Sequence, residues 1–456
     1  MTEKDIIHKL TYLLHGHRRK IFIIFGCLLI STGLNLCIPF ISKEIMDEGF
    51  IGGNKNILLY LVVGSFAIYM LISALNIIKE KVRVEIVAKV QYSLWHQAYE
   101  HLMRMKINYF DDRNAAEIFN NLSVDIANMV SVADESAFFV VTQAFSMVGG
   151  VIGLFILDYR MTILVLLFIP IKAVVMKYFA KYRKKVMDEF ILDSEKYSSW
   201  FGDTVGGVKE VKLFDILDNK HREFDEKQRV VIRKQKKMNM LSQWNSAADD
   251  VLVHLLITLI YIVGSNLVFN MQLSVGSIFA FITYSSYVTG PISAILNIGY
   301  LLSGIIPSTK RYYMFMELDE ENSNQKITTS PQFGDIELKN ISFAYEEGKP
   351  ILDGVSVIFT KGSKTAIIGR NGSGKTTIIN LLTRLYEPEN GQILLNGTNI
   401  ADMSLQAYRE MVSIVSQQIY LFNDSIRNNI CLYKQVSDAM LKIACRDSGL
   451  EDFIKE

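Results

Sequence analysis

Long apolar stretches alternate with polar, helix-patterned segments over the first 310 residues of the chain. A transmembrane helix takes about 20 mostly apolar residues, and six stretches reach that length. They are 21–41, 57–78, 138–157, 161–179, 251–269 and 275–302. Buried helices of a water-soluble protein are the competing interpretation, but such helices are usually shorter. The pattern therefore predicts an all-α membrane domain, 1–310, with six transmembrane helices.

The connections between these stretches are short on one face of the predicted membrane domain and long on the other face. Only "DYR" separates the third stretch from the fourth, and "NMQLS" separates the fifth from the sixth. The long connections carry the basic runs 181–185 and 233–237, and "HGHRRK" at 15–20 precedes the first stretch. Basic residues favour the cytoplasmic side of a membrane. We therefore expect a multi-pass protein of the cell (plasma) membrane with a cytoplasmic N-terminus and outward-facing short turns.

The long connections themselves have a helical pattern. Residues 82–105 have apolar positions three and four apart and contain no Gly or Pro. The transmembrane helices should therefore continue well beyond the lipid before turning back. Lys172 places a charge inside the fourth stretch. Charges within a span are costly and are therefore often functional, so Lys172 could line a substrate path. The preferred interpretation is that it snorkels, because it lies toward the cytoplasmic half of that stretch.

Composition and charge narrow the class of protein. Hydrophobic residues make up 50% of the chain, and the mean hydropathy of +0.21 is high for a soluble protein. The 48 basic and 47 acidic side chains give a net charge of +1. That balance gives no sign of a nucleic-acid-binding surface, so we expect the lipid bilayer and no nucleic acid as a partner.

A second kind of pattern follows a polar linker, 311–334. "DIELKNISFAY" and "ILDGVSVIF" alternate between apolar and polar residues as strands do, and "KTAIIG" runs directly into "GRNGSGKTT" at 369–377. Strand, glycine-rich loop and helix in this order is the context that a phosphate-binding loop requires. Residues 335–456 are therefore predicted to form an α/β P-loop nucleotide-binding domain.

The loop matches the pattern G-x-x-x-x-G-K-[ST] through Gly369, Gly374, Lys375 and Thr376, with Gly372 as an additional glycine. Glycines let backbone N–H groups approach phosphate oxygens, and the next helix points its N-terminus at the same anion. Lys375 should reach the β- and γ-phosphates, and Thr376 should place its hydroxyl on Mg²⁺. The predicted cofactors are ATP and Mg²⁺.

With these motifs the chain resembles an ABC (ATP-binding cassette) exporter half-transporter, which fuses six spans to one nucleotide-binding domain. The residues from 340 to 397 and "VSIVSQQIYLFNDSIRNNI" at 412–430 are similar to the family's cassette. More loosely, 107–129 and 202–224 resemble the two cytoplasmic loop stretches that dock onto the cassettes in this family.

The resemblance implies roles for two more residues. Tyr345 would stack on adenine, against the alternative of an ordinary strand aromatic. Gln417 would contact Mg²⁺, with Gln418 as the competing candidate. Together with the loop, the predicted nucleotide-binding residues are Tyr345, Gly369, Asn371, Gly372, Ser373, Gly374, Lys375, Thr376, Thr377 and Gln417, and Thr376 and Gln417 are the predicted Mg²⁺ ligands.

Several parts of the family's catalytic machinery have no match in the sequence. The family has a Leu-Ser-Gly-Gly-Gln-like signature, a Walker B Asp followed by Glu, and a switch histidine. No such stretch follows Lys375, and the last histidine is His254. Leu302-Ser303-Gly304 lies in a span and precedes the loop, so it is rejected as a signature. We therefore expect an incomplete cassette, truncated before the signature, that has no catalytic residues and is inactive by itself.

Three functions compete at this point. The first is an ATP-driven exporter subunit whose sequence is incomplete. The second is a short, catalytically incompetent subunit that pairs with a complete ABC partner. The third is a membrane protein that uses ATP only as a regulatory ligand. The order of aromatic, phosphate loop and glutamine favours an exporter that works with a second ABC half, as a homodimer or heterodimer. Its substrate could be a small molecule, a lipid or a peptide.

Overall fold

The computed structural model describes residues 3–111, 113–131, 137–321, 332–346, 348–416 and 419–455. The chain divides into two compact units. The first, here called the helical unit, comprises Met1–Met105 and Asp112–Asp319. The second, the sheet unit, comprises Lys106–Asp111 and Glu320–Glu456. A short segment from the middle of the helical sequence thus belongs to the sheet unit.

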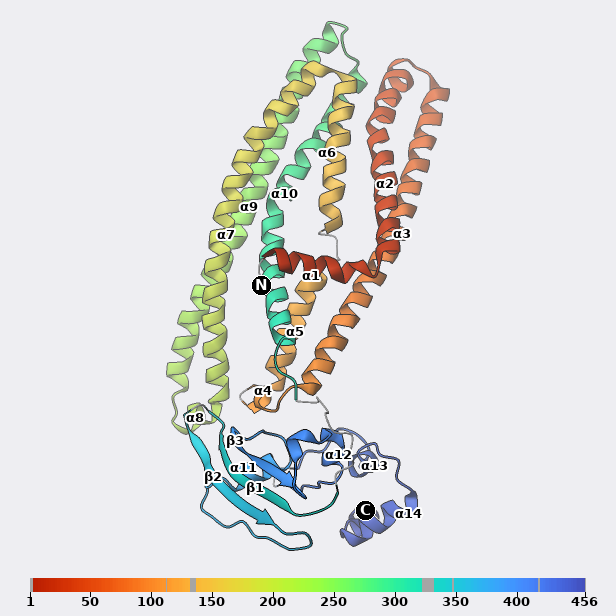
Figure 1. The fold of residues 1–456 in the computed structure, drawn as a ribbon. Coiled ribbons are helices and arrows are strands. Elements are labelled where there is room, and N and C mark those ends of the chain that lie inside the picture. Colours follow the sequence, from red (N-terminus) through yellow and green to blue (C-terminus); the bar gives the residue numbers. More distant parts are fainter. Residues whose placement is uncertain are drawn as a thin grey trace. The chain divides into compact units, whose positions relative to one another are not determined.

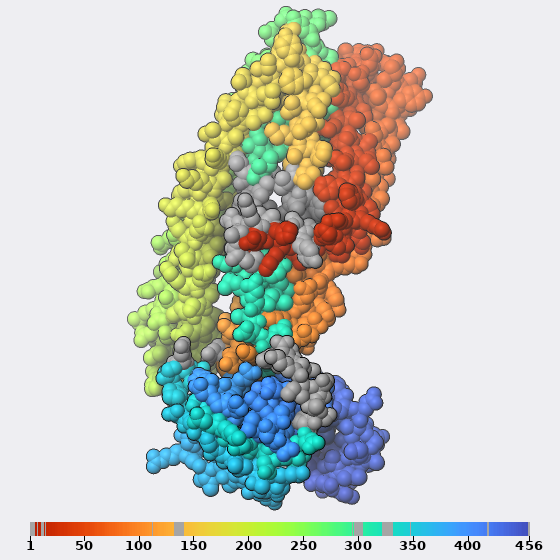
Figure 2. Space-filling model, in the orientation of Figure 1, coloured from red at the N-terminus to blue at the C-terminus, as the bar shows by residue number. Residues whose placement is uncertain are grey.

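The helical unit is built mainly from long helices (Figure 1). They are α1 (Glu3–His15), α2 (Arg18–Glu44), the π-helix η1 (Ile45–Ile51), α3 (Lys55–Arg104), α5 (Ala115–Val130), α6 (Ala137–Leu157), α7 (Tyr159–Gly206), α8 (Val208–Leu213), α9 (Leu217–Phe269) and α10 (Val275–Met316). Helices α7 and α9 run side by side, and Figure 2 shows them as a continuous yellow-to-green column.

Each predicted span lies within one of these helices. Helix α2 with η1, and helices α3, α7 and α9, are long and apolar enough to cross a membrane, and Val141–Leu157 of α6 is a shorter apolar helix. The predicted continuation beyond the lipid is confirmed, since α3 has 50 residues and α9 has 53. At 1.5 Å per residue such helices exceed the roughly 30 Å of hydrocarbon more than twofold.

The short turns between spans act as helix caps. Asp158, in the turn "DYR", accepts hydrogen bonds from the backbone N–H groups of Arg160 and Met161 at the start of α7. Ser274 caps α10 by accepting from the N–H of Ser277. These side chains satisfy donors that the first turn of a helix leaves open. A turn of very few residues can therefore reverse the chain.

The snorkelling interpretation of Lys172 is wrong. Its side chain is fully buried, and Nζ lies 2.8 Å from Oδ1 of Asp249 in α9. Ser293 of α10 donates to the same Oδ1 at 3.1 Å. By distance this is an ion pair, although Nζ makes no hydrogen bond with the described residues. The lysine therefore meets a carboxylate inside the protein instead of the membrane interface.

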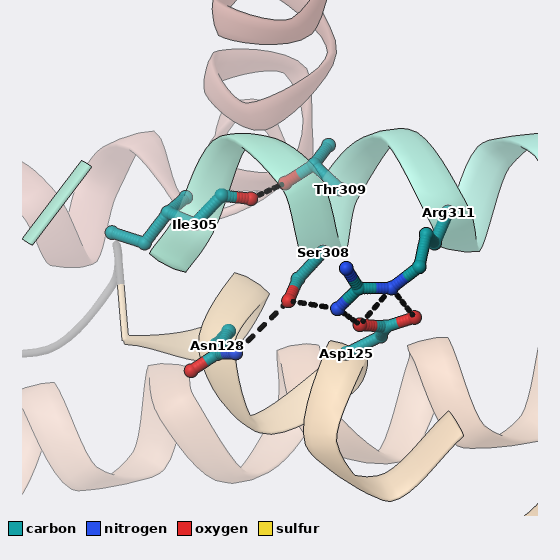
Figure 3. Close-up of polar contacts among 6 residues, drawn as sticks. All are labelled: Asp125, Asn128, Ile305, Ser308, Thr309 and Arg311. Carbon is teal, nitrogen blue, oxygen red and sulfur yellow. Dashed lines mark hydrogen bonds and ion pairs between the residues drawn. The ribbon is translucent and has the colours of Figure 1, made fainter. Parts of the chain in front are cut away.

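A second polar cluster joins α5 to α10 (Figure 3). Nε of Arg311 lies 3.1 Å from each carboxylate oxygen of Asp125, and Nη2 also donates to Oδ1 of Asp125. Ser308 receives hydrogen bonds from Arg311 at 3.1 Å and from Asn128 at 2.9 Å. Asp125 is only 4% exposed, so the cluster fixes the two helices at a sheltered point.

The sheet unit contains a four-stranded antiparallel sheet in the order β2-β1-β3-β4. Its strands are β1 (Ile336–Ala344), β2 (Pro350–Phe359), β3 (Asn390–Leu395) and β4 (Thr398–Asn399), and its helices are α4 (Asn108–Asp111), α11 (Lys375–Leu382), η3 (Ile400–Asp402), α12 (Leu405–Arg409), α13 (Ile426–Cys431), α14 (Asp438–Asp447) and α15 (Glu451–Lys455). Of the three strands predicted before the loop, the first two are confirmed as β1 and β2. The core joins β1, β2 and β3 to Leu381 of α11.

The strand predicted at 364–369 is not formed. This segment has no ladder partner among the described residues, and Ile368 is 92% exposed. A strand exists only through hydrogen bonds to a neighbour, and a short apolar run cannot by itself specify that neighbour. In the described residues, an unpaired segment leads directly into the glycine-rich loop.

Candidate nucleotide-binding site

Two glycines of the loop have a backbone that other residues rarely adopt. Gly372 has a φ of +80°, and Gly374 has a φ of +86° at the N-cap of α11. A Cβ on Gly374 would also lie 2.7 Å from Cδ2 of Leu352. Glycine is therefore required at 374 both by its backbone conformation and by close packing.

The glycine loop folds back on itself, and its backbone carbonyls bind the side chain of Lys375. The N–H of Ser373 donates to the carbonyl of Arg370 at 3.2 Å. Nζ of Lys375 donates to the carbonyls of Gly369 and Arg370 at 2.9 and 2.8 Å. The loop thus holds the ammonium group against its own backbone, and binding of the β- and γ-phosphates by Lys375 stays a prediction.

The N-terminus of α11 suits an anion. Its N-cap, Gly374, has no side chain with which to satisfy the first N–H groups of the helix. Those groups and the positive end of the helix dipole are the usual partners of a phosphate. The predicted loop residues Asn371, Ser373 and Thr376 are exposed. Thr377 is 4% exposed, so its side chain contributes to packing.

Tyr345 lies just beyond the end of β1 and beside α11. Its hydroxyl accepts a hydrogen bond from Asn380 at 3.1 Å. Its ring meets Phe343 and Tyr386 edge to face, with centroids 4.9 and 5.1 Å away. The side chain is nevertheless 40% exposed, so part of the ring is open to a ligand. Adenine stacking by Tyr345 stays a prediction.

Gln417 and its competitor Gln418 lie outside the described residues. The structure places the loop residues 369–377 at the N-terminus of α11, and a hydrogen bond from Asn380 joins Tyr345 to the same helix. The role of either glutamine on Mg²⁺ stays a prediction.

Sequence reasoning missed Tyr386, which follows α11. Its hydroxyl donates to both carboxylate oxygens of Asp111 in α4, at 2.9 and 2.7 Å. Burial, and then Asp111, raise the pKa of Tyr386, so the hydroxyl stays a proton donor at neutral pH. Asp111 lies in the first stretch, 107–129, that resembles a docking loop. The other stretch that resembles a docking loop, 202–224, contains α8, and α8 belongs to the helical unit and not to the sheet unit.

Comparison with known proteins agrees with this architecture. Residues 21–292 match the family model of the ABC transporter transmembrane region, and residues 352–456 match the ABC transporter model, which describes an ATP-binding domain. The first match alone covers more than half of the chain.

Similar proteins come from several bacteria. An ATP-dependent lipid A-core flippase of Syntrophus aciditrophicus is 23% identical over 453 residues, which cover 99% of this chain and 75% of the relative. One of Haemophilus influenzae is 27% identical over 411 residues, covering 87% and 68%. An uncharacterized ABC transporter ATP-binding protein of Bacillus subtilis, YknV, is 26% identical over 445 residues, covering 95% and 72%.

The helical unit with its apolar helices accounts for the first family match, and the sheet unit with its phosphate loop accounts for the second. The protein is thus an integral membrane protein with an ATP-binding domain of an ATPase family. The chain belongs to the ABC transporter family and is an exporter subunit in which the membrane permease is fused to the ATP-binding domain.

Proposed function

We propose that this exporter subunit binds MgATP at the loop 369–377 and pairs with a second ABC half. The pair uses the nucleotide cycle to move a lipid-like amphiphile outward from the cytoplasm across the plasma membrane. Support for a lipid-like substrate comes from the names of two relatives, which are lipid A-core flippases. Small molecules and peptides are the competing classes.

The observation that carries the proposal is the position of α4. It lies between α3 and α5 in the chain, yet it belongs to the sheet unit and is bonded to Tyr386 next to the nucleotide helix. A change at the nucleotide site can therefore act on the membrane helices through a segment that is continuous with them.

Each predicted site residue has a defined task in this proposal. The backbone of the glycine loop and of the first turn of α11 holds the phosphates, and Lys375 leaves the loop carbonyls to bind them. Thr376 and Gln417 would hold Mg²⁺, which neutralises phosphate charge when bound. Tyr345 would offer the open part of its ring to adenine.

Hydrolysis needs more than these residues. No part of the sequence matches the family's signature, its Walker B carboxylates or its switch histidine. We therefore propose that the 456 residues bind MgATP without turning it over by themselves, and that turnover requires residues outside this sequence.

The test uses the chain in nanodiscs. We expect MgATP to bind and the Lys375→Ala variant to bind about 10- to 100-fold more weakly, because a charge-assisted contact is lost. A Lys364→Ala variant, outside the loop, should bind normally. We expect no ATPase activity above that of Lys375→Ala. Absence of MgATP binding by the unchanged chain would contradict the proposal.

The transport part is tested separately. The chain and a complete ABC half are placed in proteoliposomes that contain a fluorescent phospholipid, and its movement between leaflets is followed after MgATP is added. ATP-dependent movement that disappears with Lys375→Ala would support a lipid-like substrate. Movement of a peptide or a soluble dye, but not of the lipid, would contradict it.

A further inference from the structure

The C-terminal end of the nucleotide helix α11 is capped from another element. No basic residue lies in its last turn. Instead, Tyr408 of α12 donates to the carbonyl of Leu382 at 2.6 Å. Arg409 donates to the carbonyl of Thr383 at 3.4 Å and to that of Arg384 at 2.9 Å. Thr383 is the C-cap of α11 and Arg384 follows it, so this guanidinium lies just beyond the end of the helix and offsets the negative end of its dipole.

Arg409 also holds a residue that follows the last membrane helix. Its Nη1 and Nη2 donate to the two carboxylate oxygens of Glu321 at 3.0 and 2.9 Å. Helix α10 ends at Met316, so Glu321 lies where the chain passes from that helix into the sheet unit. The side chains of Arg409 and Glu321 are 35% and 24% exposed, which shields this forked pair from solvent more than an ordinary surface pair.

The other connection between the units reaches the same end of α11. The chain enters the sheet unit through α4, and there Asp111 accepts the hydrogen bond of Tyr386, just after α11. A cavity of about 290 Å³ is lined by residues from both connections and from the end of α11, including Asn108, Glu321 and Tyr386. Both passages of the chain are therefore fixed near one point, at the end of α11 opposite the phosphate loop.

We propose that Arg409 is a positioning residue that transmits the nucleotide state from α11 to the segment following α10, through Glu321, independently of the α4 contact. The inference rests on the proposed binding of MgATP at the loop. Helix α11 has eight residues and is about 12 Å long, so it acts as a short rod with the loop at one end and Arg409 at the other. Lysine could not replace Arg409, because only the planar fork binds both carboxylate oxygens and the two carbonyls that follow α11 together.

The experiment compares hydrogen exchange of the full chain in nanodiscs with and without MgATP. In the unchanged protein, MgATP should slow exchange at 371–378, at 108–111 and at 317–321. In Glu321→Gln, Arg409 keeps its bonds to the carbonyls of Thr383 and Arg384 but loses its carboxylate partner. The ratio of exchange rates without and with MgATP at 317–321 should then fall by about tenfold, because losing one charge-assisted hydrogen bond changes an equilibrium by about that factor. The affinity for MgATP should stay within about twofold of that of the unchanged protein.

Two further variants make the test specific. Tyr386→Phe removes only the bond to Asp111, so it should lose the slowing at 108–111 and retain it at 317–321. Arg409→Lys keeps the charge and should behave like Glu321→Gln. This reciprocal pattern is not expected if Arg409 and Glu321 only stabilise the fold, because a general loss of stability would affect all three segments.

The outcomes separate this inference from the proposed function. If Lys375→Ala abolishes the slowing everywhere but Glu321→Gln and Arg409→Lys leave 317–321 unchanged, MgATP binding stands and the role of Arg409 is refuted. Slowing confined to 371–378 in the unchanged protein would also refute it. If MgATP changes exchange nowhere, the proposed function itself fails.

Discussion

At the scale of single residues, Lys172 shows what a pattern along one helix can and cannot reveal. The sequence identifies a charge inside an apolar stretch, which is an unusual and costly position. The sequence does not reveal that Asp249, from another helix, meets that charge, or that Ser293, from a third helix, donates to Asp249. Contacts between helices depend on how each helix is rotated, and the apolar pattern of a span that is hydrophobic on all sides leaves that rotation open.

We expect Asp249→Ala to lower the free energy of unfolding of the helical unit by about 3–5 kcal/mol, because it leaves the buried ammonium of Lys172 without a counter-charge. Replacing both partners, as Lys172→Met with Asp249→Leu, should recover most of the loss. Unfolding of the purified protein in mixed detergent measures both. A double variant as unstable as the single one would show that the pair itself stabilises the fold.

The phosphate loop supports a second prediction for single residues. Gly374→Ala should weaken MgATP binding by more than about tenfold, because it strains a left-handed backbone and drives Cβ against Leu352. Gly348→Ala is the matched control. Gly348 has a φ of +83° but has open space around it, and it lies outside the loop. Titration with MgATP should show weaker binding by Gly374→Ala than by Gly348→Ala. Equal binding by the two variants would contradict a requirement for glycine at 374.

At the scale of elements, the sequence predicts the helices better than the strands. Spacing of apolar residues is a local signal, and it correctly indicated helices that continue past the lipid as well as β1 and β2. The segment 364–369 is a short apolar run that leads into the glycine loop and was predicted as a strand, but a strand depends on a distant partner that the local sequence does not specify. Local patterns also gave no sign of the polar cluster between α5 and α10 (Figure 3).

That cluster leads to a prediction about two elements. Arg311→Gln should cost about 1.5–3 kcal/mol of unfolding free energy, because Asp125 is 4% exposed and would lose its charged partner. Arg311→Lys should recover only part of this, since lysine cannot bind both oxygens in the same plane. Lys310→Gln, at the adjacent and exposed position, is the control. A loss no larger than that of the control would mean that the cluster does not stabilise the pairing of α5 with α10.

At the scale of the whole molecule, the apolar stretches and the glycine loop predicted a membrane domain joined to a nucleotide-binding domain, because both signals are continuous in sequence. The resemblance of 340–397 and 412–430 to the ABC cassette then indicated the exporter family. Residues that join distant segments were not predictable, and Tyr386, Arg409 and Glu321 are examples. The division into 1–310, 311–334 and 335–456 follows the linear order of the chain and stays a prediction. The two compact units do not follow that linear order, because Lys106–Asp111 lies between helices of the helical unit in sequence and yet belongs to the sheet unit.

The length of α3 has a mechanical consequence. Its 50 residues form one continuous helix without proline, about 75 Å long, of which about 45 Å exceeds the hydrocarbon thickness. Such a rod works as a lever with unequal arms. If it pivots by about 10° at the edge of the membrane, its far end travels about 8 Å, whereas the arm within the lipid sweeps a smaller distance. Such a pivot converts a movement of the far end of α3 into a smaller, more forceful movement of its apolar arm.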